Sequence, residues 1–142
     1  MNDNFRDDCL FCSILVGKTP AKVVYEDDHV LAFLDIDPVC EGHTLLIPKK
    51  HFDDLLTVEL EYLSPIMEAT KKITQNLVVK LPAEGFNVVQ NNKKAAGQII
   101  YHYHIHLIPR NDNDGVRIIN SQATIREDLF SKLDDTLNRI KM

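Results

Sequence analysis

The sequence predicts an α+β domain built on a mostly antiparallel sheet. Two observations support this fold class: the apolar patterns change between strand-like and helix-like spacing, and their order is strands, helix, strands, helix. No linker, internal repeat or low-complexity tract interrupts the 142 residues. A chain of this length and continuity fits one domain spanning residues 1–142.

The predicted strands are runs of β-branched and aromatic residues bounded by turn residues. A short apolar segment at residues 10–16 precedes them and is closed by Gly17 and Pro20. Five strand-like runs follow, at residues 22–25, 30–36, 43–47, 85–90 and 101–108. The first three lie close together in the sequence, as successive antiparallel strands do.

Apolar residues at spacings of three and four predict two helices. The first covers about residues 57–79, with Thr57 as a possible N-cap. Ser64 is an alternative N-cap, because proline, here Pro65, is favoured at the first helical position. The second helix covers about residues 126–140.

The composition argues against several classes of partner. A formal net charge of -5 and a pI near 5.6 disfavour binding to a nucleic-acid polymer. A small phosphorylated ligand is still possible, because imidazoles and backbone amides can reverse the potential locally. The N-terminus has no signal-peptide pattern, no apolar run reaches membrane-spanning length, and the three cysteines are an odd set. We therefore expect a cytoplasmic protein without a membrane partner.

The most informative stretch is the run from Tyr101 to Arg110, in which histidine alternates with bulky apolar or aromatic residues. On a strand, His102, His104 and His106 would share one face. At about 3.3 Å per residue the outer two would lie roughly 13 Å apart, too far to share one metal ion. A lone buried histidine is usually a core residue, but three in alternation favour function. A cupin-like metal pair of His102 and His104 is the main competing interpretation.

A second motif is the C-x-x-C pair formed by Cys9 and Cys12. This spacing alone is weak evidence, because such pairs also occur as buried thiols or redox motifs. A zinc site would need two further ligands.

The histidine run resembles the signature of the histidine triad (HIT) family. The resemblance extends to three upstream blocks, at residues 20–28, 31–36 and 42–51, and covers a core from about Cys9 to Arg110. It implies a five-stranded antiparallel sheet with two helices, and a homodimer in which the sheets of two copies join. It also implies a nucleotide-like small molecule as ligand, cleaved at its α-phosphate through a nucleotidyl-histidine intermediate.

The resemblance further implies roles for individual residues. His104 would be the nucleophile, with His106, His43 and Gln98 beside the phosphate and no catalytic cofactor. The nucleotide would also be contacted by residues near the base, the ribose and the loop before the triad: Phe33, Asp35, Ile36, Asn91 and Gly97. The turn sequence that begins at Asp35 has an ordinary structural explanation as well.

By the same resemblance, a structural zinc ion would be bound by Cys9, Cys12, His51 and His102. Ile99 departs from the family pattern, which commonly has serine or threonine after Gly-Gln. That difference affects the expected preference for the leaving group of the substrate. His29 and Cys40 receive no role.

The resemblance thus implies a HIT-type enzyme, a nucleotide hydrolase or nucleotidyl transferase, with a purine nucleoside phosphoramidase and a dinucleoside polyphosphate hydrolase as its two main versions. A non-catalytic nucleotide-binding or scaffold protein on the same fold is the alternative.

Overall fold

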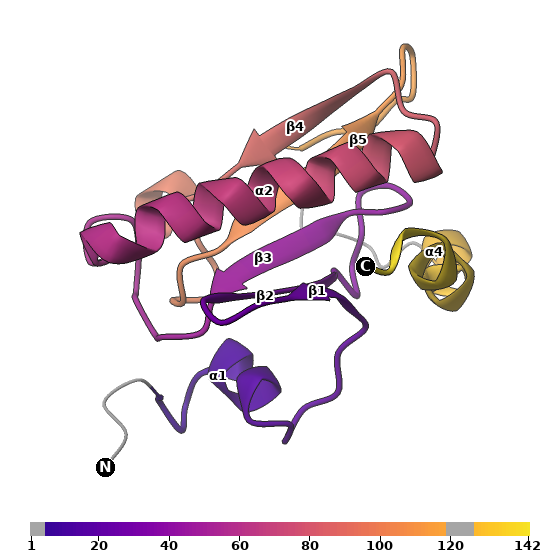
Figure 1. Ribbon diagram of the computed structural model, residues 1–142. Coiled ribbons are helices and arrows are strands. Elements are labelled where there is room, and N and C mark those ends of the chain that lie inside the picture. Colours follow the sequence, from indigo (N-terminus) through magenta and orange to yellow (C-terminus); the bar gives the residue numbers. More distant parts are fainter. Residues whose placement is uncertain (1–4, 119–126) are drawn as a thin grey trace.

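The computed structural model describes residues 5–118 and 127–142 as an α+β fold around one antiparallel sheet (Figure 1). The strands are β1 (Val23–Glu26), β2 (Val30–Leu34), β3 (Thr44–Pro48), β4 (Gly85–Val89) and β5 (Ile105–Arg110). They lie in the order β1-β2-β3-β5-β4, and every neighbouring pair is antiparallel. The five-stranded antiparallel sheet expected from the sequence is therefore confirmed.

One long helix, α2 (Leu60–Lys80), lies across one face of this sheet (Figure 1). Its buried residues Ile66, Ile73 and Leu77 join the main core cluster with sheet residues such as Leu46 and Leu107. The short helix α1 (Leu10–Leu15) lies on the opposite side of the sheet, where Phe11 packs in a smaller cluster. The remaining members of that cluster are Leu31, Phe33, Leu45 and Ile47.

The fifth strand begins later than its sequence pattern predicts. The alternation suggested a strand over residues 101–108, but β5 starts at Ile105. Before it, the backbone N–H of Tyr103 donates to the carbonyl oxygen of Phe52 at 2.6 Å, outside the sheet ladder. The expectation that His102, His104 and His106 share one strand face is therefore wrong, since only His106 lies on β5.

Helix α2 begins at Leu60, four residues before the alternative start at Ser64. Its N-cap is Glu59, without a side-chain hydrogen bond to the helix. The hydroxyl of Thr57 instead bonds the backbone of Asp54, closing the preceding turn. Pro65 lies inside the helix, so neither expected cap is used. A 3-10 turn, η1 (Lys94–Ala96), occupies the loop before the triad.

The C-terminal region forms two short helices where one was expected. These are α3 (Glu127–Phe130) and α4 (Leu133–Ile140), while residue 126 lies outside the described residues. The buried side chains of Leu133 and Ile140 attach α4 to the main core, and the backbone N–H of Met142 donates to Val24 in β1. Among the described residues, no helix is long and apolar enough to cross a membrane.

Candidate active site and metal centre

The ends of three neighbouring strands bring a carboxylate and two histidines together. Asp35 follows β2, His43 precedes β3, and His106 lies on β5 opposite Leu45. Leu45 belongs to the cluster around α1, so His106 projects toward the α1 side of the sheet. The Nε2 atom of His43 lies 2.8 Å from Nδ1 of His106 and 3.6 Å from Oδ2 of Asp35.

Hydrogen bonds determine which ring nitrogens of this pair carry protons. The backbone N–H of Val39 donates to Nδ1 of His43 at 3.1 Å, so the proton of a neutral His43 sits on Nε2. That Nε2–H donates to Nδ1 of His106, and the proton of a neutral His106 is therefore on its own Nε2. The hydrogen bonds from Val39 through His43 to His106 are here called the relay. They leave the Nε2–H of His106 as a donor at the end of the relay.

The proton position on His104 is fixed in the same way, by the backbone. Its Nδ1–H donates to the carbonyl oxygen of His102 at 2.7 Å, which leaves a lone pair on Nε2. The edge of the Phe11 ring packs against the imidazole, with the two ring centroids 5.2 Å apart. Burial lowers the pKa of His104, which favours the neutral ring.

Burial also keeps the other two imidazoles neutral. It lowers the pKa of His43 to about 3, with smaller contributions from the neighbouring histidines, and that of His106 to about 4. Burial raises the pKa of Asp35 to about 6, although the backbone N–H of Asp37 donates to its Oδ1 at 2.9 Å. This last bond confirms the structural turn at Asp35.

Asp35, His43 and His106 are close enough together to resemble a metal site. The relay argues against that use. A metal on Nε2 of His43 would have to displace the proton there while Nδ1 still accepts from Val39. The two histidines are therefore better described as a hydrogen-bonded pair with the Asp35 carboxylate beside it.

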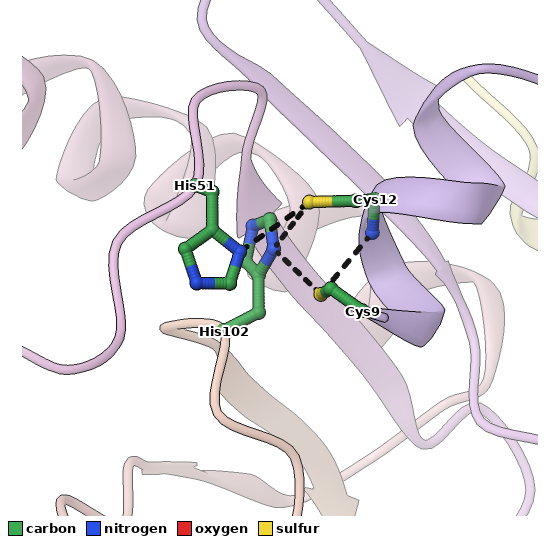
Figure 2. Close-up of side chains that lie close together, drawn as sticks. All are labelled: Cys9, Cys12, His51 and His102. Carbon is green, nitrogen blue, oxygen red and sulfur yellow. Dashed lines mark hydrogen bonds between the residues drawn. The ribbon is translucent and has the colours of Figure 1, made fainter. Parts of the chain in front are cut away.

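A second cluster joins Cys9, Cys12, His51 and His102, as Figure 2 shows. The Sγ atoms of Cys9 and Cys12 lie 3.4 and 3.6 Å from Nδ1 of His102, and Sγ of Cys12 lies 3.3 Å from Nδ1 of His51. All four ligand atoms lie within 4.8 Å of one another. Two thiols and two imidazoles in this arrangement match a tetrahedral centre.

The outer nitrogens of both imidazoles are bonded in the manner of metal-binding histidines. Nε2–H of His102 donates to the carbonyl oxygen of Pro48 at 3.0 Å, and Nε2–H of His51 donates to Oδ1 of Asp53 at 2.8 Å. Both Nδ1 lone pairs therefore face the sulfur atoms. Burial raises the pKa of the Cys12 thiol to about 11, a change that a bound cation would reverse. The cupin-like pair is disfavoured, because His102 belongs to this cluster and His104 does not.

The residues expected around the nucleotide occupy different environments. Phe33 is buried against Phe11, whereas Ile36 is 66% exposed. Gly97 adopts a left-handed conformation with φ +91° at the end of η1. Gln98 is 4% exposed, and within the described part of the chain its amide bonds backbone atoms of Lys93, Asp53 and Ile100. Among the remaining candidates, Asn91 is half-buried and Ile99 is 76% exposed.

Sequence reasoning missed Asp53, which bonds a cluster histidine, and Phe11, which contacts His104. Phe11 lies between the two cysteines of the C-x-x-C pair, a position that could have indicated it. Nothing in the sequence distinguishes Asp53 from its neighbour Asp54. Of the two residues without an expected role, Cys40 donates to the carbonyl of Pro109 and His29 packs edge-on against Tyr62.

A family model described as the HIT domain matches residues 16–113. The chain belongs to the HIT family. Protein hit of Bacillus subtilis is 43% identical over 104 residues, 73% of this chain and 72% of that protein. An adenosine 5'-monophosphoramidase of Candida albicans is 42% identical over 110 residues, covering 73% of this chain and 71% of the relative. An adenylylsulfatase of Arabidopsis thaliana is 37% identical over 113 residues, 80% of this chain and 57% of the relative.

Solved structures of other HIT proteins share the fold. A Hit-like protein from Bartonella henselae is 34% identical, with a TM-score of 0.82 over 96% of this chain and 97% of that one. A zinc-bound histidine triad protein from Mycobacterium smegmatis is 35% identical, with a TM-score of 0.75 over 92% and 94% of the two chains. The family resemblance noted in the sequence is thereby confirmed.

Proposed function

We propose that this HIT protein is a nucleotide hydrolase or nucleotidyl transferase that acts at the α-phosphate of a nucleoside phosphoramidate or dinucleoside polyphosphate. The observation that carries the proposal is the hydrogen bond from Nδ1–H of His104 to the His102 carbonyl oxygen. It leaves the Nε2 lone pair of a neutral imidazole as the nucleophile. The named activities of the Candida and Arabidopsis relatives support this class of reaction.

In the first step, Nε2 of His104 attacks the α-phosphorus. A P–N bond forms while the bond from phosphorus to the leaving group breaks. The ring becomes cationic, and the His102 carbonyl oxygen on Nδ1–H stabilises that charge. In the second step, water attacks phosphorus and releases one proton to solvent, the P–N bond breaks, and the lone pair returns to Nε2.

The relay through His43 gives His106 its role. Nε2–H of His106 donates to a non-bridging phosphate oxygen, because Nδ1 is already occupied by His43. His43 has both ring nitrogens engaged within the protein, so it acts through His106. Asp35 lies next to this pair and accepts hydrogen bonds from the ribose hydroxyls, with Ile36 exposed beside it for the base.

The leaving group lies beside Ile99. This side chain is 76% exposed and cannot donate a hydrogen bond. Departure of an amine therefore receives no assistance from position 99. We expect slower turnover of phosphoramidates than an enzyme with serine or threonine there would show.

The Cys9, Cys12, His51 and His102 cluster binds one structural zinc ion. Support comes from its two-sulfur, two-nitrogen composition, from the acceptors behind both imidazoles, and from the zinc-bound Mycobacterium relative. The ion ties α1 to the segments that carry His51 and His102. It takes no part in bond making, which is assigned to His104.

A homodimer joins the sheets through β4. This strand is at the edge of the sheet, beyond β5, and its residues Phe86 and Val88 are 53% and 43% exposed. An apolar edge strand whose outer side pairs with no other strand among the described residues is a pairing surface. A second copy paired there extends the sheet across the two chains.

Trapping the intermediate tests the central claim. Rapid alkaline quench during turnover of a slow substrate, followed by mass spectrometry, should find a nucleoside monophosphate on the peptide containing His104. His104→Ala should abolish turnover and leave nucleotide binding and zinc content intact. Turnover that survives in this variant, or an adduct on another residue, would refute the assignment. Nucleotide binding by wild type without any adduct or turnover would instead establish a non-catalytic binding protein.

The substrate is identified by comparing turnover of adenosine phosphoramidate, guanosine phosphoramidate and diadenosine tetraphosphate, each with and without chelator. The first two compounds report the base preference, and the third reports the leaving group. Rapid inactivation by a chelator without any change in hydrogen–deuterium exchange near the triad would favour metal-dependent chemistry.

A further inference from the structure

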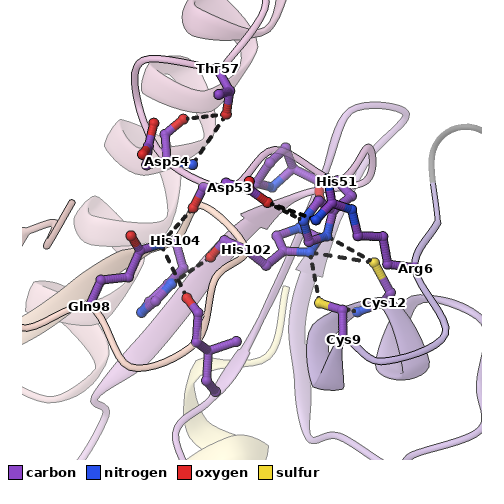
Figure 3. Close-up of polar contacts among 12 residues, drawn as sticks. Arg6, Cys9, Cys12, His51, Asp53, Asp54, Thr57, Gln98, His102 and His104 are labelled. Atoms are coloured by element: carbon purple, nitrogen blue, oxygen red, sulfur yellow. Dashed lines mark hydrogen bonds and ion pairs between the residues drawn. The ribbon is translucent and has the colours of Figure 1, made fainter. Parts of the chain in front are cut away.

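We propose that Asp53 is a positioning residue that couples the Cys9–Cys12–His51–His102 cluster to the loop and turn that carry the nucleophile. Residues 51–55 are here called the clamp segment; within it, Asp53 lies between His51 of the cluster and Gln98 of the loop before the triad (Figure 3). The proposal deepens the proposed function, but its metal and exchange measurements do not depend on turnover.

Asp53 contacts the cluster through its side chain. Its Oδ1 accepts from Nε2–H of His51 at 2.8 Å and lies 3.3 Å from a guanidinium nitrogen of Arg6. The first bond orients the His51 ring so that Nδ1 faces Cys12. Asp53 therefore fixes a metal ligand from behind and ties it to the segment that precedes α1.

The same residue contacts the loop before the triad through its backbone. Nε2 of Gln98 donates to the Asp53 carbonyl oxygen at 2.6 Å, while Oε1 of Gln98 accepts from the backbone N–H of Lys93 at 2.7 Å. Nε2 also reaches the carbonyl oxygen of Ile100 at 3.2 Å. The buried amide of Gln98 thus joins the clamp segment to the residues on either side of η1. The Gln98 amide therefore positions the loop before the triad.

Three further bonds run in parallel along the clamp segment. They join the Phe52 carbonyl oxygen to the Tyr103 N–H at 2.6 Å, Asp54 to Nζ of Lys93 at 2.7 Å, and the Leu55 N–H to Oδ1 of Asn92 at 2.8 Å. The carboxylate of Asp54 is nearly buried. Lys93 has a φ of +71°, unfavourable for a side chain with a Cβ, and these contacts stabilise it.

The two routes converge on the segment that leads to the nucleophile. One passes from the cluster through His51, Asp53 and Gln98 to the loop, and the other passes through His102, whose carbonyl oxygen orients His104. A zinc ion held by Cys9, Cys12, His51 and His102 would fix the starting points of both routes. The placement of His104 therefore depends on metal loading, and Asp53 transmits that dependence.

Hydrogen–deuterium exchange on the full-length, zinc-loaded protein tests this coupling. Removing zinc with a chelator should speed exchange of the Lys93 and Tyr103 amides roughly fivefold or more, the effect of weakening one hydrogen bond. Amides of the β1–β2 turn serve as an internal reference. Asp53→Ala should show the same acceleration with zinc bound, and it should lose about 10- to 100-fold in zinc affinity.

Two variants separate positioning from general destabilisation. Asp53→Glu keeps an acceptor for His51 and should recover most of the zinc affinity. Asp134→Asn removes a surface ion pair with Lys22 and should behave as wild type in every measurement. With a nucleotide substrate, Asp53→Ala should lower kcat with little change in KM.

The coupling is refuted if metal-free wild type exchanges at residues 92–104 as slowly as the loaded protein. It is equally refuted if loaded Asp53→Ala matches Asp134→Asn in exchange and zinc affinity. Neither outcome depends on which nucleotide is the substrate, so an absence of turnover would count against the proposed function alone.

Discussion

Gly42, which directly precedes His43, offers a quantitative test of how closely the site is packed. Its φ is +86°, and a Cβ added there would lie 2.3 Å from Cδ1 of Leu81 and 3.2 Å from Cγ of Pro109. The left-handed conformation costs a residue with a Cβ about 1–2 kcal/mol, and overpacking of the surrounding side chains adds about 1–3 kcal/mol. We expect Gly42→Ala to lower the free energy of unfolding by about 2–5 kcal/mol.

Two other glycines separate these contributions. Gly115 has a φ of +68° but no atom within 4 Å of an added Cβ, so Gly115→Ala should show the conformational cost alone, about 1–2 kcal/mol. Gly85 has neither a positive φ nor a close neighbour. Gly85→Ala should therefore change stability by less than about 0.5 kcal/mol.

Urea denaturation of the zinc-loaded proteins at one pH measures the free energy of unfolding of all three variants. Relief of the clash at position 42 would displace the backbone next to His43, so we expect kcat of Gly42→Ala to fall as well. If Gly42→Ala is no less stable than Gly115→Ala, the close packing beside His43 contributes nothing and the reasoning fails.

Four further predictions concern the proposed chemistry, metal and assembly. His106→Ala should lower kcat by about 100- to 1000-fold, as expected when one charge-stabilising donor is lost. Cys9→Ser should reduce the zinc content, measured by elemental analysis, and lower the melting temperature. Phe86→Lys on the β4 edge should convert a dimer into a monomer in sedimentation at micromolar concentration. Asp35→Asn should gain stability relative to wild type between pH 4 and pH 7, by up to about 3 kcal/mol in urea denaturation.

The sign of the Asp35 effect follows from its raised pKa. Between the unfolded pKa and the folded value of about 6, the folded chain binds the proton more tightly. The resulting stabilisation is complete below the unfolded pKa and is lost as the pH rises through about 6. Asparagine avoids that loss, so a constant difference between variant and wild type across this range would contradict the argument.

The other three predictions have equally clear negative outcomes. A kcat within tenfold of wild type in His106→Ala would exclude a direct contact with the phosphate. A metal-free protein with an unchanged melting temperature would exclude a structural role for zinc. Wild type that sediments as a monomer throughout the tested range would exclude the dimer.

Much of the sheet could be predicted from the sequence, because strand residues and turn residues alternate clearly along the chain. The run from Tyr101 to His104 could not. Its alternation is the same as in a strand, but the N–H of Tyr103 bonds Phe52, a residue far away in the sequence, instead of a neighbouring strand. Local pattern contains no information about such a partner.

The functional residues also differ in how far local sequence could predict them. Local spacing marked the histidine row as functional, whereas the separate roles of His104 and His106, and the grouping of Cys9 and Cys12 with His51 and His102, came from the family resemblance. The cluster is assembled from three separate segments, so no spacing rule could have predicted it. The role of Asp53 depends on contacts made by both its side chain and its backbone, which only the folded chain reveals.

The clamp segment also closes a loop in the chain. The bond between Leu55 and Asn92 ties together the two ends of the excursion that contains α2 and β4. The entropy cost of closing a flexible loop grows only with the logarithm of its length, about 0.6 kcal/mol for each doubling. Extra residues placed in the α2–β4 connection, after Pro82, should therefore lower the free energy of unfolding only slightly and leave the three histidines in place. That connection is a suitable place to insert a reporter peptide into the working enzyme.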